Sequence, residues 1–578
     1  MEVYIVSELN EKVLTEAGNQ KSGGYISQLT FNNGQLLDIS SNDIVVFVGP
    51  NNVGKSQTLK DLYALSSEKV PSVVISDIKI TKYPFPISTT LAEISNGVND
   101  GYCISYNVFG HRMNIWDYTD KDFPRERLFG NYRDLFVVNL DTSARLTICN
   151  PPKIIARNEA KMHPIHYASF DGKYRKWLSG SFKRAFGIEI TPNTQYGSII
   201  PLCIGEPVQL TGEYEDEQTR QEEYAKILEK YKQVQNQGDG IKSFTGILLY
   251  LMLDYYCTYL IDEPESFLHP PQARIMGQII GKTLSNNQQA FISTHSEEII
   301  KGLLEVCPER IKIVRITREE DTNTFSILNN AEFNQVWNDP LLKYSNIMAS
   351  LFHKSVVLCE SDSDCKMYSI VENNIKQKQQ KYSETLFIHC GGKHRMAMII
   401  TALKSLNIDV KLITDIDVLN DQTVFSSIVE SCGINFDSVS ADYNNIVSNL
   451  HSPKEKINRN SAKSSINQIL DSSTSTDLSK REIGEIEDVI STISKWKAIK
   501  NSGVSALPAG NATSSYKKLD ELLKENGIFI VPVGELECFI KDVGGHGPDW
   551  TNSVLEKYPD LDNEAYKSIT EFVDSMNL

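Results

Sequence analysis

The sequence has few of the features that mark secreted proteins, membrane-spanning proteins or proteins with a generally basic surface. Its ten cysteines form no CxxC pair, and the nearest two are Cys359 and Cys365, so neither a disulfide framework nor a zinc knuckle is indicated. The longest apolar stretch, residues 247–261, is too short to span a bilayer and contains Asp254. We expect a buried helix followed by a buried strand in this stretch.

Basic residues are also in the minority. The 58 lysines and arginines are outnumbered by 74 acidic residues, which gives a net charge of −16. This balance argues against a generally basic surface, although a local positive groove for nucleic acid remains compatible with it. Residues 1–13 carry acidic side chains where a signal peptide has basic ones, and no apolar segment follows. We therefore expect a cytoplasmic protein without a membrane partner.

A chain of 578 residues is longer than one hydrophobic core supports, so two or more domains are expected. Hydrophobic residues make up 40% and charged residues 23%, which is ordinary for a globular protein and points to no function. Function must therefore be inferred from local motifs.

The first motif is a phosphate-binding loop. Residues 49–56 read Gly-Pro-Asn-Asn-Val-Gly-Lys-Ser and follow an apolar strand expected at 43–48, so they match GxxxxGK[ST] in its usual context. Backbone amides of such a loop surround phosphates, while Lys55 reaches the β- and γ-phosphates and Ser56 binds Mg²⁺. A glycine-rich turn without a ligand is the alternative. The predicted nucleotide contacts are Gly49, Asn51, Asn52, Gly54, Lys55, Ser56 and Gln57.

A second motif returns to nucleotide chemistry about two hundred residues later. Residues 257–265 form an apolar strand that ends in the paired acids Asp262 and Glu263, and residues 293–296 read Ser-Thr-His-Ser. Asp262 is suited to hold Mg²⁺, and Glu263 to orient or deprotonate the attacking water. A surface turn with two acids is the simpler interpretation of this strand end.

These motifs together resemble the ABC/SMC-type ATPase fold. The resemblance implies that His295 is the switch histidine that senses the γ-phosphate. It also implies that residues 238–243, with Gly240 and Ser243, are a degenerate signature loop that contacts ATP bound to another subunit. A homodimer or higher oligomer is therefore expected, and the divergent loop leaves the rate of hydrolysis open.

Acidic residues also follow two strands in the second half. Residues 356–359 are an apolar strand that delivers Glu360, with Asp364 four residues later, and residues 410–414 deliver Asp415 and Asp417. Two acids separated by one residue project to the same side of a strand end. Such carboxylates repel one another unless a cation neutralises them, so we predict a Mg²⁺ or Mn²⁺ site. Solvated surface acids are the alternative.

The order of these acids resembles the Toprim pattern, except that Ser361 stands where that pattern has glycine. Between the two acidic strands, residues 389–395 form a glycine turn with basic residues, which suits contact with a phosphate or a surface turn equally. Near the end, residues 527–537 are similar to the C-terminal Toprim segment of overcoming-lysogenization-defect (OLD) nucleases. That resemblance implies a further metal ligand, Glu537 first and Glu535 second, and a charge-stabilising lysine, Lys500.

The expected fold is α/β, with an ABC/SMC-like ATPase followed by a Rossmann-like Toprim domain. We assign residues 1–70 and 236–345 to the two ATPase halves, and 71–235 to an insert, β-rich and then helical, with a role in dimerisation. Residues 346–578 form the Toprim domain, with a polar insertion at about 421–495.

The resemblance implies an ATP-regulated DNA endonuclease that uses ATP and Mg²⁺ or Mn²⁺. OLD-type proteins resemble bacterial anti-phage effectors of retron, Gabija-like and Septu-like systems, and the retron version is favoured here. Its partner would be a reverse transcriptase with its multicopy single-stranded DNA.

Three alternatives remain open at this point. The first is an SMC-like ATP-dependent DNA-binding or repair protein without nuclease activity. The second is a topoisomerase or primase, although we find neither a tyrosine-bearing domain nor a zinc module in the sequence. The third is an ATP-gated toxin that acts on RNA.

Overall fold

The computed structural model describes most of the chain from Ser22 onward. The described residues are 22–578 without 95, 96, 100–102, 109, 110, 126, 207, 209, 211–215, 254, 320, 321, 328–345, 406, 407, 451–457, 473–477, 480, 481, 484, 487, 488 and 490–494. The chain divides into two compact units, Met1–Asn330 and Ala331–Leu578. The expected boundary at 345/346 adjoins residues 328–345, which lie outside the described part.

The first unit is built around a six-stranded sheet in the order β15-β14-β3-β13-β12-β8. Five strands run parallel, and β15 is an antiparallel edge strand. All residues of β3 and β13 are buried, as expected for strands whose two faces are both covered. The strands are β3 (Ile44–Val48), β8 (Val137–Leu140), β12 (Thr258–Asp262), β13 (Gln289–Ser293), β14 (Ile311–Glu319) and β15 (Thr322–Ile327).

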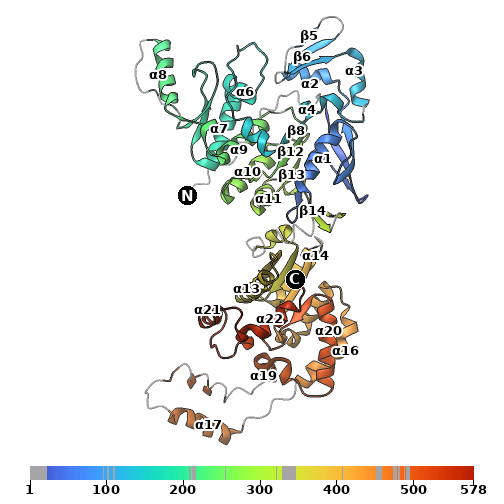
Figure 1. Cartoon of the computed structure of the whole chain (residues 1–578), viewed down its shortest axis with the longest axis vertical. Helices are drawn as coiled ribbons and strands as arrows, with labels where there is room; N and C mark the ends of the chain where they lie inside the picture. Colours follow the sequence, from blue (N-terminus) through green and yellow to red (C-terminus); the bar gives the residue numbers. More distant parts are fainter. Residues whose placement is uncertain are drawn as a thin grey trace. The chain divides into compact units, whose positions relative to one another are not determined.

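Helices cover both faces of this sheet. In Figure 1, α1 (Lys55–Ser67) lies on one side of the strands, and α9 (Asp239–Leu251), α10 (Pro270–Thr283) and α11 (Glu297–Leu304) lie on the other. A smaller antiparallel sheet, β2-β1-β4, adjoins them, formed by β1 (Gly24–Phe31), β2 (Leu36–Asp38) and β4 (Ile75–Lys82). Because helices cover both faces, the carboxyl ends of β3, β12 and β13 remain accessible at one end of the sheet.

The interval 71–235 contributes to the ATPase core as well as to peripheral elements, because β8 pairs with β12 in the central sheet. The helical part of this interval is α8, which spans Glu217–Glu229, and β11 follows at Lys232–Gln233. The other elements include α2 (Ile87–Ile94), β5 (Val98–Asn99), β6 (Ile104–Val108), β7 (His111–Ile115), α5 (Thr142–Thr147), α6 (Pro164–Phe170), α7 (Gly172–Phe186), β9 (Glu189–Pro192) and β10 (Leu202–Gly205).

The second unit contains a four-stranded parallel sheet in the order β17-β16-β18-β19. This confirms the α/β alternation expected from the sequence. The strands are β16 (Ser355–Cys359), β17 (Thr385–His389), β18 (Asp409–Thr414) and β19 (Ile528–Ile530). The main helices are α13 (Asp362–Lys378), α14 (Met396–Ser405), α19 (Lys495–Ser502), α20 (Asn511–Glu525), α21 (Pro548–Lys557) and α22 (Lys567–Asp574).

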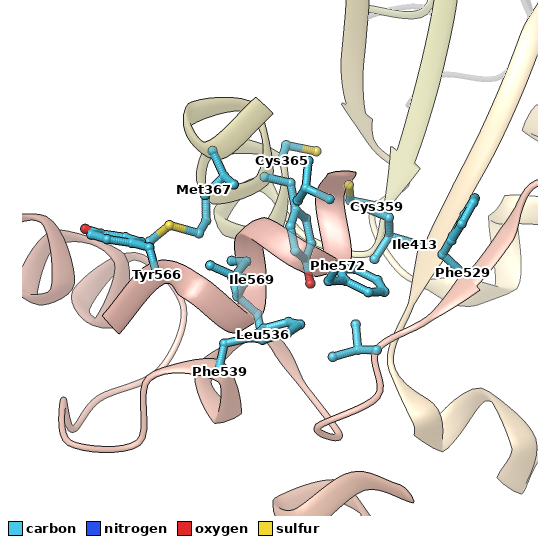
Figure 2. Close-up of a cluster of buried hydrophobic side chains, with 14 of the residues drawn as sticks. Cys359, Cys365, Met367, Ile413, Phe529, Leu536, Phe539, Tyr566, Ile569 and Phe572 are labelled. Atoms are coloured by element: carbon cyan, nitrogen blue, oxygen red, sulfur yellow. The ribbon is translucent and has the colours of Figure 1, made fainter. Parts of the chain in front are cut away.

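One hydrophobic core fixes the sheet of the second unit against the helices beside it. Figure 2 shows Cys359, Ile413 and Phe529 from three strands beside Ile569 and Phe572 of α22. Met367 and Tyr368 of α13 belong to the same buried cluster. The first turn of α13, which carries Asp364, is therefore packed firmly against the sheet.

The expected polar insertion at 421–495 is polar only in part. Helices α15 (Gln422–Ser431) and α16 (Phe436–Leu450) bury apolar side chains, and Phe425 stacks on Tyr443 with ring centroids 5.1 Å apart. By contrast, α17 (Arg459–Asp471) has no buried residue. Residues 422–450 therefore belong to the folded core.

Within the described part of the chain, no helix is long and apolar enough to cross a membrane.

Asp61 on α1 fastens the phosphate-loop helix to β4. Its buried carboxylate accepts hydrogen bonds from the backbone amides of Val73, Val74 and Ile75 at 2.6–3.1 Å. Asp61→Ala is expected to destabilise the first unit by about 3 kcal/mol, because a buried unsatisfied donor costs about 1–3 kcal/mol. Urea unfolding measures this loss, and hydrogen exchange at residues 73–75 should accelerate. Exposed Lys60→Ala is the control, and unchanged exchange in Asp61→Ala would refute this role.

Candidate nucleotide and metal sites

Lys55 sits inside the phosphate loop, where β3 passes into α1. Its ammonium donates hydrogen bonds to the carbonyl oxygens of Gly49 and Pro50 at 2.9 and 2.7 Å. Burial lowers the pKa of Lys55 to about 8, and nearby carboxylates led by Glu263 partly offset this effect. A buried ammonium that donates to two backbone carbonyls is well placed to exchange them for phosphate oxygens.

Asp262 and Glu263 end β12 beside the end of β13. Asp262 pairs in register with Ser293, whose hydroxyl donates to the Asp262 carboxylate. Glu263 has a φ of 47°, and its Oε2 accepts a hydrogen bond from Ser266 Oγ at 3.1 Å. Its Oε1 lies 3.7 Å from Nε2 of His295. The structure thus brings Lys55 together with Asp262, Glu263 and His295, as the sequence suggested.

The surroundings of His295 favour the neutral form of its imidazole. Burial and the charge of Lys55 lower its pKa, while Glu263 and Asp262 oppose them. A neutral imidazole can both donate and accept a hydrogen bond, which suits a group that contacts a phosphate and Glu263.

Two functional residues of this site were not foreseen from the sequence. Arg145 of α5 is fully buried, and its guanidinium donates to the backbone carbonyls of Leu140 and Asp262. Glu265 accepts a hydrogen bond from the backbone amide of His295 at 2.7 Å, which ties the two loops together. Burial raises the pKa of Glu265. Only the Glu265 position, beside the paired acids, gave a signal in the sequence.

The remaining predicted nucleotide residues are placed less uniformly. Asn51 and Asn52 are exposed, Gly54 and Ser56 are half-buried, and Gln57 donates to Asp61 at 2.8 Å. Gly240 lies against the carbonyl oxygen of Phe267. Ser243 is fully buried in α9, so its hydroxyl is not presented to a second subunit in this conformation.

In the second unit, Glu360, Asp415 and Asp417 form one carboxylate group at adjacent strand ends. One oxygen from each lies within 4.8 Å of the others. Glu360 Oε1 accepts hydrogen bonds from Thr414 Oγ1 at 2.7 Å and from the backbone amide of Asp415 at 3.0 Å. Burial and then repulsion from Glu360, Asp364 and Asp417 raise the pKa of Asp415 well above its usual range. The group has the donor chemistry that a hard divalent cation prefers.

Asp364 lies beside this group but is not one of its three members. Burial is the largest of the effects that raise the pKa of Asp364 to about 6, and the charges of Glu360 and Glu537 add to it. Hydrogen bonds from Ser361 act in the opposite direction. Ser361 caps α13 and exchanges two hydrogen bonds with Asp364. This capping role explains why a serine suits the position where the Toprim pattern has glycine.

Glu535 and Glu537 meet a residue that the sequence did not single out, His546. The three side chains form a second possible ligand group. Glu537 Oε1 lies 2.6 Å from His546 Nδ1 and accepts the backbone amide of Gly547 at 2.7 Å. Lys500 Nζ lies 3.2 Å from Glu535 Oε2. Burial alone would lower the pKa of Lys500, but Glu535, Asp417 and Asp415 raise it overall.

Gly534 explains how Lys500 reaches these acids. Its φ is 115°, and a Cβ at this position would lie 2.0 Å from the carbonyl oxygen of Lys500. Its own carbonyl accepts the backbone amide of Ile416 at 3.1 Å. Because it is a glycine, residue 534 can contact both the Lys500 backbone at the end of α19 and the loop that carries Asp415 and Asp417.

Tyr368 lies beneath the acids on α13 and was also missed by sequence reasoning. Burial raises the pKa of Tyr368 well above the usual range, and the negative charges of Asp364 and Asp415 raise it further. Its hydroxyl has no hydrogen-bond partner among the described residues. One buried tyrosine on an apolar helix face carries no sequence signal that separates it from core packing.

Two protein-family models match the chain. Residues 44–301 match AAA_21, described as an AAA domain of the AbiEii, type IV toxin–antitoxin kind. Residues 351–417 match the Toprim domain of overcoming-lysogenization-defect-like proteins. The matches include the phosphate loop and Asp262 in the first unit, and Glu360, Asp415 and Asp417 in the second.

Individual relatives are more distant. An uncharacterized protein of Methanocaldococcus jannaschii is 41% identical over 69 residues, which cover 12% of this chain and 60% of that protein. The Smc head domain from Pyrococcus furiosus, solved bound to the C-terminal domain of ScpA, is 10% identical and covers 55% of this chain and 99% of its own, with a TM-score of 0.31. The SMC head domain from Thermotoga maritima is 12% identical, with coverages of 54% and 98% and a TM-score of 0.27.

The order of the two family matches along the chain agrees with the order of the two sites. An AAA-type ATPase domain comes first, and an OLD-like Toprim domain follows it. The chain therefore combines an AAA-type ATPase domain with an OLD-like Toprim domain.

Proposed function

We propose that the protein is an ATP-regulated, divalent-metal-dependent endonuclease that hydrolyses phosphodiester bonds in DNA. The observation that carries this proposal is the group of Glu360, Asp415 and Asp417, whose oxygens gather within 4.8 Å at the ends of two adjacent parallel strands. The OLD-like Toprim match covers these residues. Carboxylates that repel one another in this way fit a metal-dependent hydrolase better than a purely structural acid cluster.

Each residue has a definable task in this reaction. Glu360, Asp415 and Asp417 would hold one ion, and Asp364, Glu537 and Glu535 would contribute to a second. Bound Mg²⁺ or Mn²⁺ supplies an activated water and neutralises charge on the phosphate. Lys500, whose ammonium faces Glu535, Asp417 and Asp415, would stabilise the negative charge that develops on the scissile phosphate.

The nucleotide site would control access to this reaction. Lys55, Ser56 and Asp262 would bind MgATP, and Glu263 with His295 would act on the attacking water and the γ-phosphate. Gly240 and Ser243 would complete the site of a second copy in a homodimer, which requires α9 to begin differently because Ser243 is buried here. We further propose, from the resemblance to OLD-type effectors, an anti-phage role with a reverse transcriptase and its multicopy single-stranded DNA as partner.

Asp415→Asn tests the metal centre. Without metal, the variant is expected to be at least as stable as the native protein, because a buried repelling charge is removed. Mn²⁺ at about 100 times its Kd should stabilise the native protein by about 2.7 kcal/mol and the variant by much less. Thermal unfolding measures both effects, and plasmid cleavage with Mg²⁺ or Mn²⁺ should be lost in the variant.

The control is Asp409→Asn, at the exposed amino end of the same strand. Equal Mn²⁺ stabilisation of the native protein and Asp415→Asn would count against the metal centre. If Mn²⁺ binds but neither DNA nor RNA is cut, an ATP-dependent DNA-binding protein becomes the better description. Cleavage of RNA but not of DNA would favour the alternative of an ATP-gated toxin that acts on RNA.

Lys55→Ala tests the nucleotide site. The variant is expected to bind ATP at least 100-fold more weakly, as measured by isothermal titration calorimetry. Because the pKa of Lys55 is lowered to about 8, the native affinity should fall as pH rises from 7 to 9 and the ammonium loses its proton. A flat pH profile in the native protein, or normal affinity in Lys55→Ala, would refute this assignment. Exposed Lys60→Ala should bind normally.

Arg145→Met tests whether Arg145 positions the end of β12. ATP affinity should change less than threefold, whereas hydrolysis should fall at least tenfold, because the Asp262 backbone loses a buried donor. The control is Arg184→Met, whose guanidinium donates to Gln278 at 2.7 Å instead. Equal losses of binding and hydrolysis, with an unchanged circular dichroism spectrum, would argue against a positioning role.

A further inference from the structure

Lys393 follows β17 on the turn beside the carboxylate group. Its ammonium lies 3.0 Å from Oδ1 of Asp417 and 3.4 Å from the Asp417 carbonyl oxygen. The side chains are about one-fifth and one-third exposed, at 21% and 29%. Lys393 therefore forms an ion pair with one of the three carboxylates at the proposed metal site.

The turn that carries Lys393 is anchored to the strand that carries Glu360. The backbone amide of Cys390 donates to the Cys359 carbonyl at 3.0 Å, and that of Gly392 donates to the Glu360 carbonyl at 3.3 Å. Gly391 and Gly392 have φ values of 66° and 108°. Residues with a side chain rarely adopt this conformation, so the two glycines allow the tight turn that presents Lys393.

The Lys393 ammonium and a divalent ion would compete for the Asp417 carboxylate. A divalent ion carries twice the charge of an ammonium, so an ion held by Glu360, Asp415 and Asp417 would displace Lys393 from Asp417. The anchored turn keeps the released ammonium at the edge of the site. There, the nearest anion to replace Asp417 is a non-bridging oxygen of a bound phosphodiester.

We propose that Lys393 and its glycine turn form a phosphate-binding site for the DNA backbone, which Asp417 occupies until metal binds. Lys393 thereby lowers the affinity for metal in the absence of DNA and contributes to DNA affinity once metal is bound. The inference rests on the proposed nuclease function. It assigns to Lys393 a role separate from that of Lys500, which pairs with Glu535 on a different element.

The first measurement is Mn²⁺ binding by isothermal titration calorimetry without DNA. Lys393→Met is expected to bind Mn²⁺ about three- to fivefold more tightly, the change expected from removing a partly exposed competing ion pair. Lys404→Met is the matched control, because the Lys404 ammonium donates to the Cys432 carbonyl at 2.8 Å and faces no acid of the site. Unchanged Mn²⁺ affinity in Lys393→Met would overturn the competition.

The second measurement is the salt dependence of binding to a short DNA duplex, with Ca²⁺ occupying the metal site and fluorescence anisotropy as the readout. Loss of one phosphate contact should reduce the slope of log K against log salt by about 0.9 in Lys393→Met. Lys393→Arg should retain the slope, since it keeps the charge. A structural role would alter affinity without changing this slope.

These outcomes separate the inference from the proposed function. If the native protein binds no Mn²⁺, or binds it independently of Asp415, the nuclease proposal fails and the inference fails with it. If the native protein binds Mn²⁺ through Asp415, and Lys393→Met matches it in Mn²⁺ affinity and salt slope, the inference alone is wrong.

Discussion

Electrostatic repulsion among buried carboxylates is the constraint on which the second unit depends. Glu360, Asp415 and Asp417 gather at the ends of β16 and β18, and repulsion raises the pKa of Asp415 well above its usual range. The fold tolerates this arrangement because cations approach from two different elements. Lys393 pairs with Asp417, and Lys500 pairs with Glu535. Neither ion pair includes Glu360 or Asp415, and a divalent ion would contribute most at these two residues.

The nucleotide site solves a related problem with the same kind of architecture. Parallel strands again deliver acids to one edge of a sheet, where Lys55 faces Glu263, Glu265 and Asp262. The buried Arg145 holds the backbone carbonyl of Asp262, and Glu265 holds the backbone amide of His295. In both units, the chemistry therefore depends on side chains at the carboxyl ends of strands, where helix packing leaves the backbone accessible.

The sequence predicted those parts of both sites that lie next to one another along the chain. Continuous apolar runs predicted β3, β12 and β16, because buried parallel strands need apolar side chains on both faces. The acids that follow these strands then predicted where the sites lie. The glycine turn at 389–395, which carries Lys393, suited either a phosphate contact or a surface turn. By contrast, Arg145 and His546 reach their sites through tertiary contacts. No local pattern distinguishes such residues from ordinary packed or surface side chains.

Two differences have specific physical causes. Residues 422–450 pack into the core because their apolar side chains recur on one face of each helix, although the overall composition of the segment is polar. Ser243 is buried because α9 begins at Asp239, so the expected signature loop forms part of a helix.

The central claim is that the carboxylates of the second unit form a metal centre, and anomalous X-ray diffraction from crystals soaked in Mn²⁺ tests it directly. The account predicts an anomalous peak at coordination distance, about 2.2 Å, from oxygens of Glu360, Asp415 and Asp417. It also predicts that the Lys393 ammonium has moved away from Asp417. A map with no peak between these carboxylates, and with Lys393 still paired to Asp417, would contradict the account.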